Sequence, residues 1–245
     1  MNPVSWRWMW RDGDETIGYG EIVLGIAPKA NTLLADQLFS PSLLLAERIE
    51  RGLIDLGGKT VVELGAGCAL PSLLASTMPA PRTPQLVVIT DYPSDEILSN
   101  LAKNVAQNSH LVQASCKVVW EGYEWGQDAS PILEHLHHGM GFDVVILSDL
   151  LYFDTSHAAL AESVVALLGR HKEARVYAAA GKYTAWNVCE KFLEELRGKG
   201  ISWSKEMAGT DAAAGEWLGR EVRGVSRAGL DGRKGNCWWW VGEWS

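Results

Sequence analysis

A glycine-rich loop holds the residues of this sequence that are best suited to bind a ligand. It reads Gly65-Ala66-Gly67 and follows an apolar run that ends in Glu63-Leu64. Glycine lets the backbone turn tightly and approach a ligand closely. A dinucleotide-binding loop needs a small residue where this sequence has Leu70, so a pyrophosphate would be crowded. The loop therefore favours S-adenosylmethionine, a ligand without phosphates, with Glu63 placed to receive its ammonium group directly or through water.

A carboxylate follows the next apolar run, in the stretch Asp91-Tyr92-Pro93. In doubly wound folds, an acidic side chain at the end of the second strand accepts hydrogen bonds from the hydroxyls of a ribose. Asp91 can instead cap the helix expected over residues 94–107, because aspartate is a favoured N-cap residue. We predict that Asp91 binds the ribose and that Tyr92 belongs to the same cofactor site.

Two further stretches complete the candidate site. An adenine ring needs a flat apolar face, which Trp125 can supply, although tryptophan is also commonly buried in a core. The fourth strand is expected to end at Ser148-Asp149, and Tyr152 follows. Residues beyond the carboxyl ends of parallel strands line the ligand site in such folds. We therefore predict that Ser148 contacts the cofactor, that Asp149 orients an incoming amine rather than capping a helix, and that Tyr152 walls the channel.

Strands and helices alternate around these residues. We expect strands over 59–64, 86–90, 116–119, 142–147 and 174–180, and helices over 40–51, 69–78, 94–107, 155–168 and 184–196. The strands are continuous apolar runs, which are typical of a parallel sheet covered on both faces. The sequence thus predicts an α/β fold with a doubly wound sheet and right-handed crossovers. In the first helix, Ser40 is expected to act as the cap and Pro41 to take the first helical position.

The two ends of the chain depart from this alternation. Trp6, Trp8 and Trp10 alternate with other residues ahead of a turn signal at 12–14, and 21–26 is apolar, which predicts a hairpin. Near the other end we expect strands over 201–206 and 237–241, joined by a partly looped, glycine- and alanine-rich stretch over 208–235. We predict a single domain over 1–245, with an N-terminal β extension (1–38) and a C-terminal hairpin (201–245). Most of the 12 tryptophans lie in these end segments, where they are expected to fasten both hairpins to the sheet.

The motifs resemble those of methyltransferase family 16, the seven-β-strand lysine methyltransferases, and most of all its fungal elongation-factor branch, once described as nicotinamide N-methyltransferase-like. The resembling stretches are 63–67, 90–93, 121–126 and 148–152, and the D-x-x-Y element from Asp149 to Tyr152 is the most specific. The resemblance covers about residues 20–200. It implies a Rossmann-like class I methyltransferase sheet with an antiparallel seventh strand. It further implies S-adenosylmethionine as methyl donor and a protein lysine or N-terminal amine as acceptor.

The sequence departs from the family pattern in two places. The family carries a Trp followed by Asn or Asp before the first helix, near the cofactor, whereas this chain has Leu38-Phe39-Ser40. Phe39 keeps the aromatic face beside the cofactor, but the polar partner is lost. The stretch 208–235 has no counterpart in the family. Both departures lie where a substrate is selected, so the resemblance defines the chemistry more closely than the substrate.

Other functions remain open on these residues. A small-molecule N- or O-methyltransferase is one alternative, because the altered entrance and the aromatic ends suit an enclosed apolar pocket. A non-catalytic, cofactor-binding partner module is another, but it would not need the loop, the strand-end acid and the D-x-x-Y element together. An NAD-dependent oxidoreductase is disfavoured by Leu70 and by the lack of an acid–base pair for hydride transfer.

Composition narrows the partners. The 245 residues include 22 Lys and Arg against 30 Asp and Glu, a net charge of −8. This charge repels phosphate backbones, which disfavours nucleic acid as the substrate and favours a basic protein or a small amine. The resemblance to the elongation-factor branch implies a translation factor as the protein substrate.

No membrane, export or metal signal stands out. No stretch approaches the roughly 18 apolar residues of a membrane span, and the first residues lack the apolar core of a signal peptide. Four cysteines without a CxxC pair favour a reducing compartment, the cytoplasm or the nucleus. No metal site is expected, because the cluster of His135, His137 and His138 lacks further ligands at suitable spacing and is typical of a solvated loop.

Overall fold

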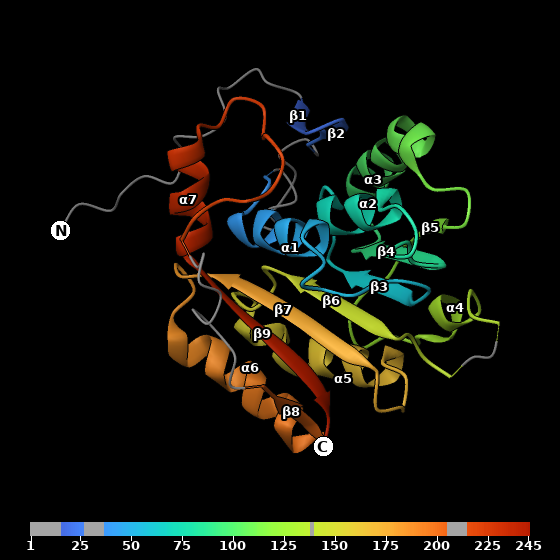
Figure 1. Cartoon of the computed structure of the whole chain (residues 1–245). Coiled ribbons are helices and arrows are strands. Elements are labelled where there is room, and N and C mark those ends of the chain that lie inside the picture. Colours follow the sequence, from blue (N-terminus) through green and yellow to red (C-terminus); the bar gives the residue numbers. More distant parts are fainter. Residues whose placement is uncertain (1–15, 27–36, 138–139, 205–214) are drawn as a thin grey trace.

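The computed structural model describes residues 16–26, 37–137, 140–204 and 215–245, and Figure 1 shows their arrangement. The strands are β1 (Thr16–Tyr19), β2 (Ile22–Gly25), β3 (Thr60–Leu64), β4 (Leu86–Asp91), β5 (Lys117–Gly122), β6 (Val144–Ser148), β7 (Arg175–Gly181), β8 (Ile201–Trp203) and β9 (Cys237–Trp244). The helices are α1 (Ser40–Glu50), α2 (Leu70–Thr77), α3 (Asp95–Asn108), α4 (Ser130–Leu133), α5 (His157–Leu167), α6 (Trp186–Gly198) and α7 (Arg227–Gly235).

Seven strands form one sheet in the order β5-β4-β3-β6-β7-β9-β8. The neighbours from β5 to β7 are all parallel, whereas β9 is antiparallel to both β7 and β8. This topology confirms the predicted α/β fold with an antiparallel strand near the C-terminus. From β3 the chain adds β4 and β5 on one side of the sheet, and it then returns to place β6 and β7 on the other side of β3. Doubly wound folds bind their ligands at such a switch point, here between β3 and β6.

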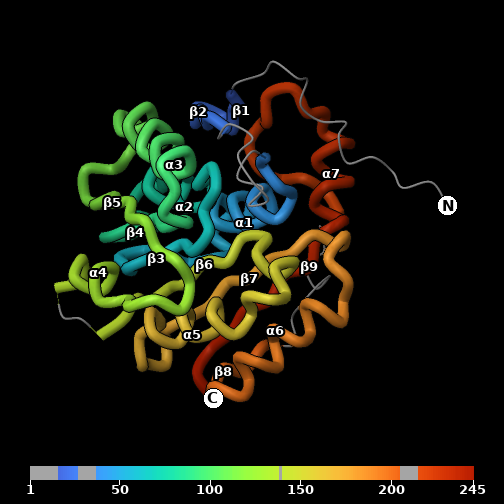
Figure 2. Tube along the Cα trace, turned by 180° about the vertical axis from the view of Figure 1, so that it is seen from behind, coloured from blue at the N-terminus to red at the C-terminus, as the bar shows by residue number. Residues whose placement is uncertain are grey.

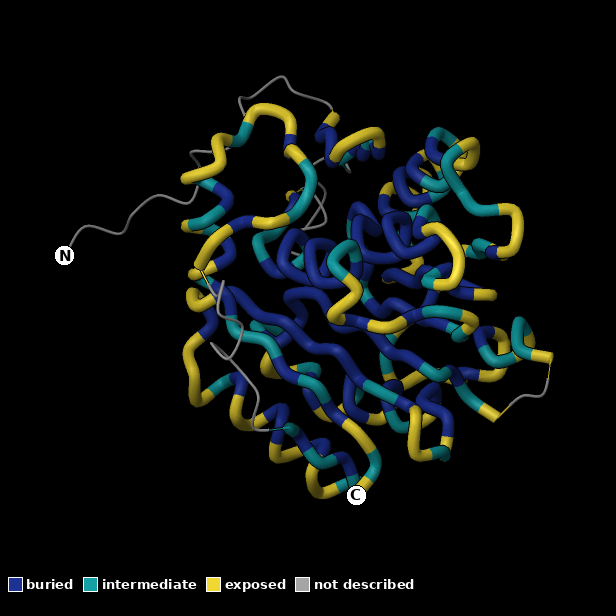
Figure 3. Tube along the Cα trace, in the orientation of Figure 1, coloured by how far each residue is buried: buried dark blue, intermediate teal, exposed yellow. Residues whose placement is uncertain are grey.

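Helices cover both faces of the sheet. Helices α1, α2 and α3 lie on one face, and α5 and α6 lie on the other (Figures 1 and 2). Successive strand residues face opposite layers, so Val61 packs with the first group of helices and Val62 with the second. The central strands are therefore buried on both sides (Figure 3), which is why they read as continuous apolar runs.

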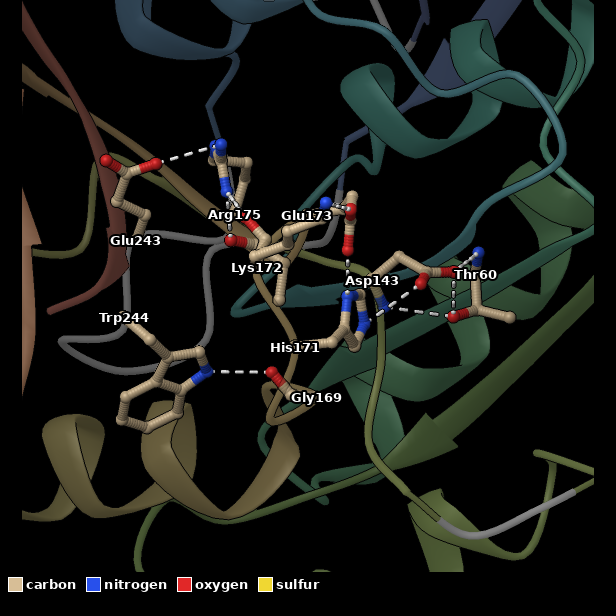
Figure 4. A network of polar contacts seen from close by, with 10 residues as sticks. Thr60, Asp143, Gly169, His171, Lys172, Glu173, Arg175, Glu243 and Trp244 are labelled. Atoms are coloured by element: carbon tan, nitrogen blue, oxygen red, sulfur yellow. Dashed lines mark hydrogen bonds and ion pairs between the residues drawn. The ribbon is translucent and has the colours of Figure 1, made fainter.

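Polar side chains tie together the edge of the sheet where the parallel strands begin (Figure 4). The Asp143 carboxylate accepts hydrogen bonds from the N–H and hydroxyl of Thr60 at the start of β3. At the same edge Arg175 of β7 forms an ion pair with Glu243 of β9 at 2.8 Å. The Trp244 indole donates to the carbonyl of Gly169. These contacts all lie where the parallel strands begin. The loops that can line a site follow the other ends of these strands.

The N-terminal hairpin lies apart from the large sheet. Strands β1 and β2 pair with each other around a turn at Gly20, whose φ is +55°. The predicted strand of Trp6, Trp8 and Trp10, with its turn at 12–14, lies outside the described residues. The predicted second strand over 21–26 is confirmed as β2.

Amide side chains of α3 take the place of a neighbouring strand along the free edge of β2. Asn104 accepts from the N–H of Gly25 and donates to its carbonyl, and Asn108 makes the same pair of bonds with Val23. The nitrogen of Asn104 also donates to the carbonyl of Cys68, in the turn that follows the glycine-rich loop. The hairpin is thereby connected to the candidate cofactor site.

The C-terminal segment contains a helix that the sequence did not predict. Within the stretch 208–235, predicted to be partly looped, residues 215–226 are mostly turns and irregular structure, and the last nine residues form helix α7, which begins after the Ser226 cap. The segment before α7 pairs with the N-terminal hairpin through a bridge between Val222 and Tyr19. Trp217 is fully buried and packs edge-on against the Tyr19 ring at 6.1 Å.

The tryptophans of β9 fasten the C-terminal strand as predicted. The Arg48 guanidinium of α1 lies 3.8 Å from the centre of the Trp239 ring, and Arg170 lies 3.6 Å from that of Trp244. Trp240 is buried on the other face of the sheet.

A local prediction about α1 was wrong: Phe39 is the N-cap residue, Ser40 is the first helical residue, and no side chain caps this end. Among the described residues, no helix is long and apolar enough to cross a membrane.

Candidate functional site

The loops that follow the parallel strands enclose a cavity of about 320 Å³ at the carboxyl edge of the sheet. Its volume is at the lower end of the range of small-molecule sites. All the predicted site residues except Glu63 line it: Phe39, Gly65, Ala66, Gly67, Asp91, Tyr92, Trp125, Ser148, Asp149 and Tyr152. The structure thus brings together residues spread over more than one hundred positions of the sequence.

The glycine-rich loop adopts a backbone that favours glycine. Gly65 and Gly67 have φ values of +57° and +54°. A Cβ at Gly65 would lie 2.7 Å from Leu150 and 3.1 Å from Trp125, so a side chain there would collide with the cavity wall. The loop is held to β4 because the N–H of Ala66 donates to the carbonyl of Thr90. Glycine at position 65 therefore serves both the turn and the close approach that the sequence suggested.

Glu63 lies beneath the loop rather than in the cavity. Its side chain is fully buried, and one carboxylate oxygen accepts from the N–H of Ser72, the third residue of α2. The other oxygen has no hydrogen-bond partner within the described part of the chain. Burial raises the pKa of Glu63 to about 8, and the nearby Asp91 adds to the rise, so Glu63 is neutral at pH 7. Glu63 is not among the residues that line the cavity, and its contact with a ligand ammonium, directly or through water, stays a prediction.

Asp91 holds the loop from the end of β4. Its two oxygens accept from the N–H groups of Gly67, at 2.6 Å, and of Tyr92, at 2.7 Å. A carboxylate has about four lone-pair sites, so each oxygen can accept one more hydrogen bond. The alternative role of Asp91 as a helix cap is wrong, because the Ser94 hydroxyl caps α3 by accepting from the N–H of Ile97. Asp91 thus lines the cavity with acceptor capacity to spare.

Trp125 forms part of the apolar wall. It is half-buried, and its ring meets Phe153 edge-on at 5.8 Å. The loop that carries it is fixed by Ser163 of α5, whose hydroxyl accepts from the N–H of Gly126 and from the Tyr123 phenol. Its placement combines both roles weighed from the sequence: one side packs on the core, and the residue still lines the cavity.

Asp149 is the most constrained residue of the site. It follows β6 with a φ of +63°, a conformation that aspartate tolerates better than most residues. One oxygen of its carboxylate accepts from the N–H of Gly181, and the other accepts from the Tyr183 hydroxyl in a short hydrogen bond. Burial raises the pKa of Asp149 to about 6, although both hydrogen bonds oppose the rise. Asp149 does not cap α5, whose N-cap residue is Ser156.

The sequence reasoning missed two residues that hold this half of the site. Tyr183, after β7, donates to Asp149 and packs against the Phe39 ring at 6.4 Å. Ser42 of α1 exchanges a 2.7 Å hydrogen bond with Ser148 and also lines the cavity. The rule that points to the carboxyl ends of β3, β4 and β6 applies equally to β7, and it was the one available signal for Tyr183.

Charge and side-chain chemistry limit what the cavity can hold. Its charged lining residues are Asp91, Glu124 and Asp149, and no lysine or arginine lines it within the described residues. The described residues contain no group of three or more histidine, cysteine or acidic side chains arranged to hold a metal ion. In the histidine cluster noted in the sequence, the ring of His135 lies 3.0 Å from a carboxylate oxygen of Glu121. The cavity therefore suits a ligand with cationic groups, hydroxyls and a flat ring.

The seven-stranded sheet with its antiparallel strand β9 is the fold of the class I methyltransferases. Residues 29–198 match the methyltransferase 16 family, described as lysine methyltransferase. The match covers more than half of the chain, so the chain belongs to this family, as its motifs predicted.

Several curated proteins that are similar to this chain are named as protein methyltransferases. Two are the protein N-terminal and lysine N-methyltransferases EFM7 of Gibberella zeae, 32% identical over 62% of this chain and 59% of the relative, and of Kluyveromyces lactis, 35% identical over 57% and 55%. The Neurospora crassa protein of that name is 27% identical over 75% of this chain and 64% of its own. The matched part therefore spans about three fifths of these relatives. The CcbJ methyltransferase of Streptomyces caelestis shares the fold, with a TM-score of 0.52 and 10% identity over 84% of this chain and 90% of its own.

Proposed function

We propose that this chain is an S-adenosylmethionine-dependent N-methyltransferase, acting as one domain over 1–245, that methylates a lysine or N-terminal amine of a protein. The observation that carries the proposal is Asp149, a buried carboxylate held by Gly181 and Tyr183 in the lining of a cavity whose charged groups, among the described residues, are all acidic. A carboxylate in that position attracts and orients an ammonium or amine. An alcohol could donate a hydrogen bond there but lacks the attraction between opposite charges, and a carboxylate substrate would be repelled.

The residues of the first half of the site fit the methyl donor. Asp91 has acceptor capacity for two ribose hydroxyls, the loop at Gly65 and Gly67 allows close approach, and Trp125 offers a flat face for adenine. Tyr92 and Ser148 complete that wall. When bound, S-adenosylmethionine supplies a methyl group activated by a sulfonium. We assign Glu63 to positioning of the loop and the start of α2 as well as to its predicted contact with the ligand ammonium.

Asp149 is better suited to orient the amine than to deprotonate it. The unperturbed pKa of lysine is near 10.4, and a neighbouring carboxylate favours the ammonium form. We therefore expect the proton to leave to water and Asp149 to hold the nitrogen in line for attack. Tyr152, with its ring 4.0 Å from that of Phe153, forms a wall of the channel, so that the amine reaches Asp149 in a restricted orientation.

The protein substrate is proposed from two supports. The relatives are named for methylation of protein N-termini and lysines, and the cavity has an acidic lining that suits a basic partner. A translation factor is the proposed partner class, in a cytoplasmic setting. All four cysteines are described and none forms a disulfide, as suits a reducing compartment.

Labelled S-adenosylmethionine tests this function directly. The protein is incubated with a cell lysate, and the label is followed in the protein and small-molecule fractions. Label in a discrete protein band is expected, and it should be absent with Asp149→Asn. Label only in small molecules would instead favour a small-molecule N- or O-methyltransferase. Cofactor binding without any transfer would favour a non-catalytic module.

A further inference from the structure

A group of aromatic rings lies on the surface beside the cavity. The group consists of Tyr183, Trp186 and Trp238, which we call the aromatic ledge. Tyr183 and Trp186 are 40% and 44% exposed, and Trp238 is half-buried. All three lie at the carboxyl edge of the sheet, because β9 begins where β7 ends: Cys237 pairs with Gly181.

The ledge is continuous with the catalytic end of the cavity. The Tyr183 hydroxyl donates a hydrogen bond to Asp149, and the Tyr183 ring packs against Phe39. Asp149 and Phe39 both line the cavity. Trp186 follows three residues later, at the start of α6. Because Tyr183 bonds to Asp149 and is itself exposed, its ring connects the lining of the cavity to the surface where α6 begins.

The rings are held rigidly before any partner arrives. Trp186 meets Trp238 at 5.1 Å, with an interplanar angle of 70°, and lies 6.2 Å from the buried Trp240. The Lys182 ammonium lies 4.7 Å from the centre of the Trp238 ring and also donates to the carbonyl of Gly235. A supported ring loses little conformational entropy on binding, which is why rigid tryptophans dominate many protein interfaces.

The size of the cavity explains why a substrate needs such a surface. A volume of about 320 Å³ accommodates one small ligand, which on the proposed function is the methyl donor. Residues that flank the target amine in a protein then have to lie on the rim. Exposed aromatic clusters beside a site commonly mark such contacts.

We propose that the aromatic ledge binds the segment of the protein substrate that flanks the methylated amine, through a bulky apolar side chain of that segment. This proposal rests on the proposed function, because it assigns the ledge to the same transfer reaction. It makes the ledge a specificity surface: it adds affinity for a protein chain and leaves cofactor binding unchanged.

The chain provides a matched control. Trp120 is 39% exposed, close to Trp186, but it lies on β5 at the opposite edge of the sheet. Replacing either tryptophan with alanine removes an exposed ring of the same size. A loss of activity in Trp186→Ala but not in Trp120→Ala is therefore caused by the position of the ring and not by the loss of an exposed tryptophan. Trp186→Phe keeps an aromatic ring at the position and provides a rescue.

The probe is a set of short synthetic peptides that have a free N-terminal amine and one lysine and differ only in the position of a single leucine. Methylation rates of the wild type should depend on that position. For the best peptide, Trp186→Ala should lower kcat/KM about tenfold, and Trp186→Phe should restore most of it. Trp120→Ala should stay within about twofold, and calorimetry should give all variants the wild-type Kd for S-adenosylmethionine.

The outcomes separate the two proposals. The ledge is refuted if Trp186→Ala keeps the leucine preference, or if Trp120→Ala loses as much as Trp186→Ala. A weakened cofactor Kd in Trp186→Ala also refutes it, since the effect would then come from the cavity. Failure of the wild type to methylate any peptide amine, despite cofactor binding, would contradict the proposed function itself and the ledge with it.

Discussion

The two halves of the carboxyl edge are built in different ways. In the half that follows β3 and β4, the supporting contacts are shorter in sequence: Asp91 reaches Gly67 across 24 residues, and Glu63 reaches Ser72 nine residues on. In the half that follows β6 and β7, the supports come from farther away. Tyr183 lies 34 residues beyond Asp149, and Ser42 reaches Ser148 across 106 residues. One half is a repeated strand–loop–helix unit, and the other is assembled from separate segments.

On the proposed function, this difference separates cofactor binding from substrate choice. The first half can keep its geometry while the second changes, because the contacts of Asp91 and Glu63 lie within two consecutive strand–loop–helix units. The second half depends on α1 and on the C-terminal segment, where Arg233 of α7 donates to the carbonyl of Leu38, next to Phe39. The C-terminal segment thus bears on the substrate side of the cavity, where the family pattern is lost.

The largest effect is expected from Asp149→Asn in the substrate half. Asparagine tolerates the positive φ and keeps the side-chain volume, so the fold should persist. Loss of the charge that orients the amine should lower the methyl-transfer rate about a thousandfold at saturating cofactor. Single-turnover transfer to the labelled protein band measures this rate, and undiminished turnover would remove Asp149 from the mechanism.

The attachment of the C-terminal segment is tested by Lys234→Met. Lys234 is buried and pairs with the buried Glu47 of α1 at 2.9 Å. Removing the ammonium leaves the buried Glu47 carboxylate with the N–H of Leu218 and the more distant Arg51, at 3.8 Å, so the free energy of unfolding should fall by about 3 kcal/mol. Lys199→Met is the control, because Lys199 pairs with Glu195 on the surface and should cost less than about 1 kcal/mol. Equal losses in urea denaturation would show that the Lys234 pair has no special role.

Asp91→Ala addresses the cofactor half. It removes the carboxylate that holds Gly67 and, on the proposed function, the ribose hydroxyls. Charge-assisted hydrogen bonds of this kind are worth about 1.5–3 kcal/mol, so the Kd for S-adenosylmethionine should rise at least about tenfold. Titration of each variant with S-adenosylmethionine, followed by tryptophan fluorescence, measures this Kd. A wild-type affinity would mean that the cofactor lies elsewhere.

The smallest effect, a shift of pH dependence, is expected from Tyr183→Phe. The pKa of Asp149 is raised to about 6 by burial, so transfer should fall as the pH drops through 6 and the carboxylate is protonated. The phenol hydrogen bond lowers that pKa, and its loss should raise it further. The acid limb of the rate profile should therefore move to higher pH, with a few-fold loss at pH 7. An unmoved acid limb would leave Tyr183 only a packing role.

The same difference between the halves explains what the sequence reveals. The apolar strands, the glycine-rich loop and Asp91 were predictable, because adjacent residues determine them and the rule for carboxyl ends places them at one edge. The contact of Glu63 with Ser72 was not predictable, because it depends on how α2 packs on β3, which residue types do not record. Tyr183 was missed for a similar reason: its role follows from the pairing of β6 with β7. Helix α7 is held by contacts with α1, nearly two hundred residues away.

The separation of the two halves is tested most directly by the calorimetric Kd for S-adenosylmethionine in Asp149→Asn, measured beside the wild type and Asp91→Ala. The account predicts a wild-type Kd, within about twofold, for Asp149→Asn and a clearly weakened one for Asp91→Ala. Equal weakening of cofactor binding in both variants would contradict it, because Asp149 would then belong to the cofactor site rather than to the amine.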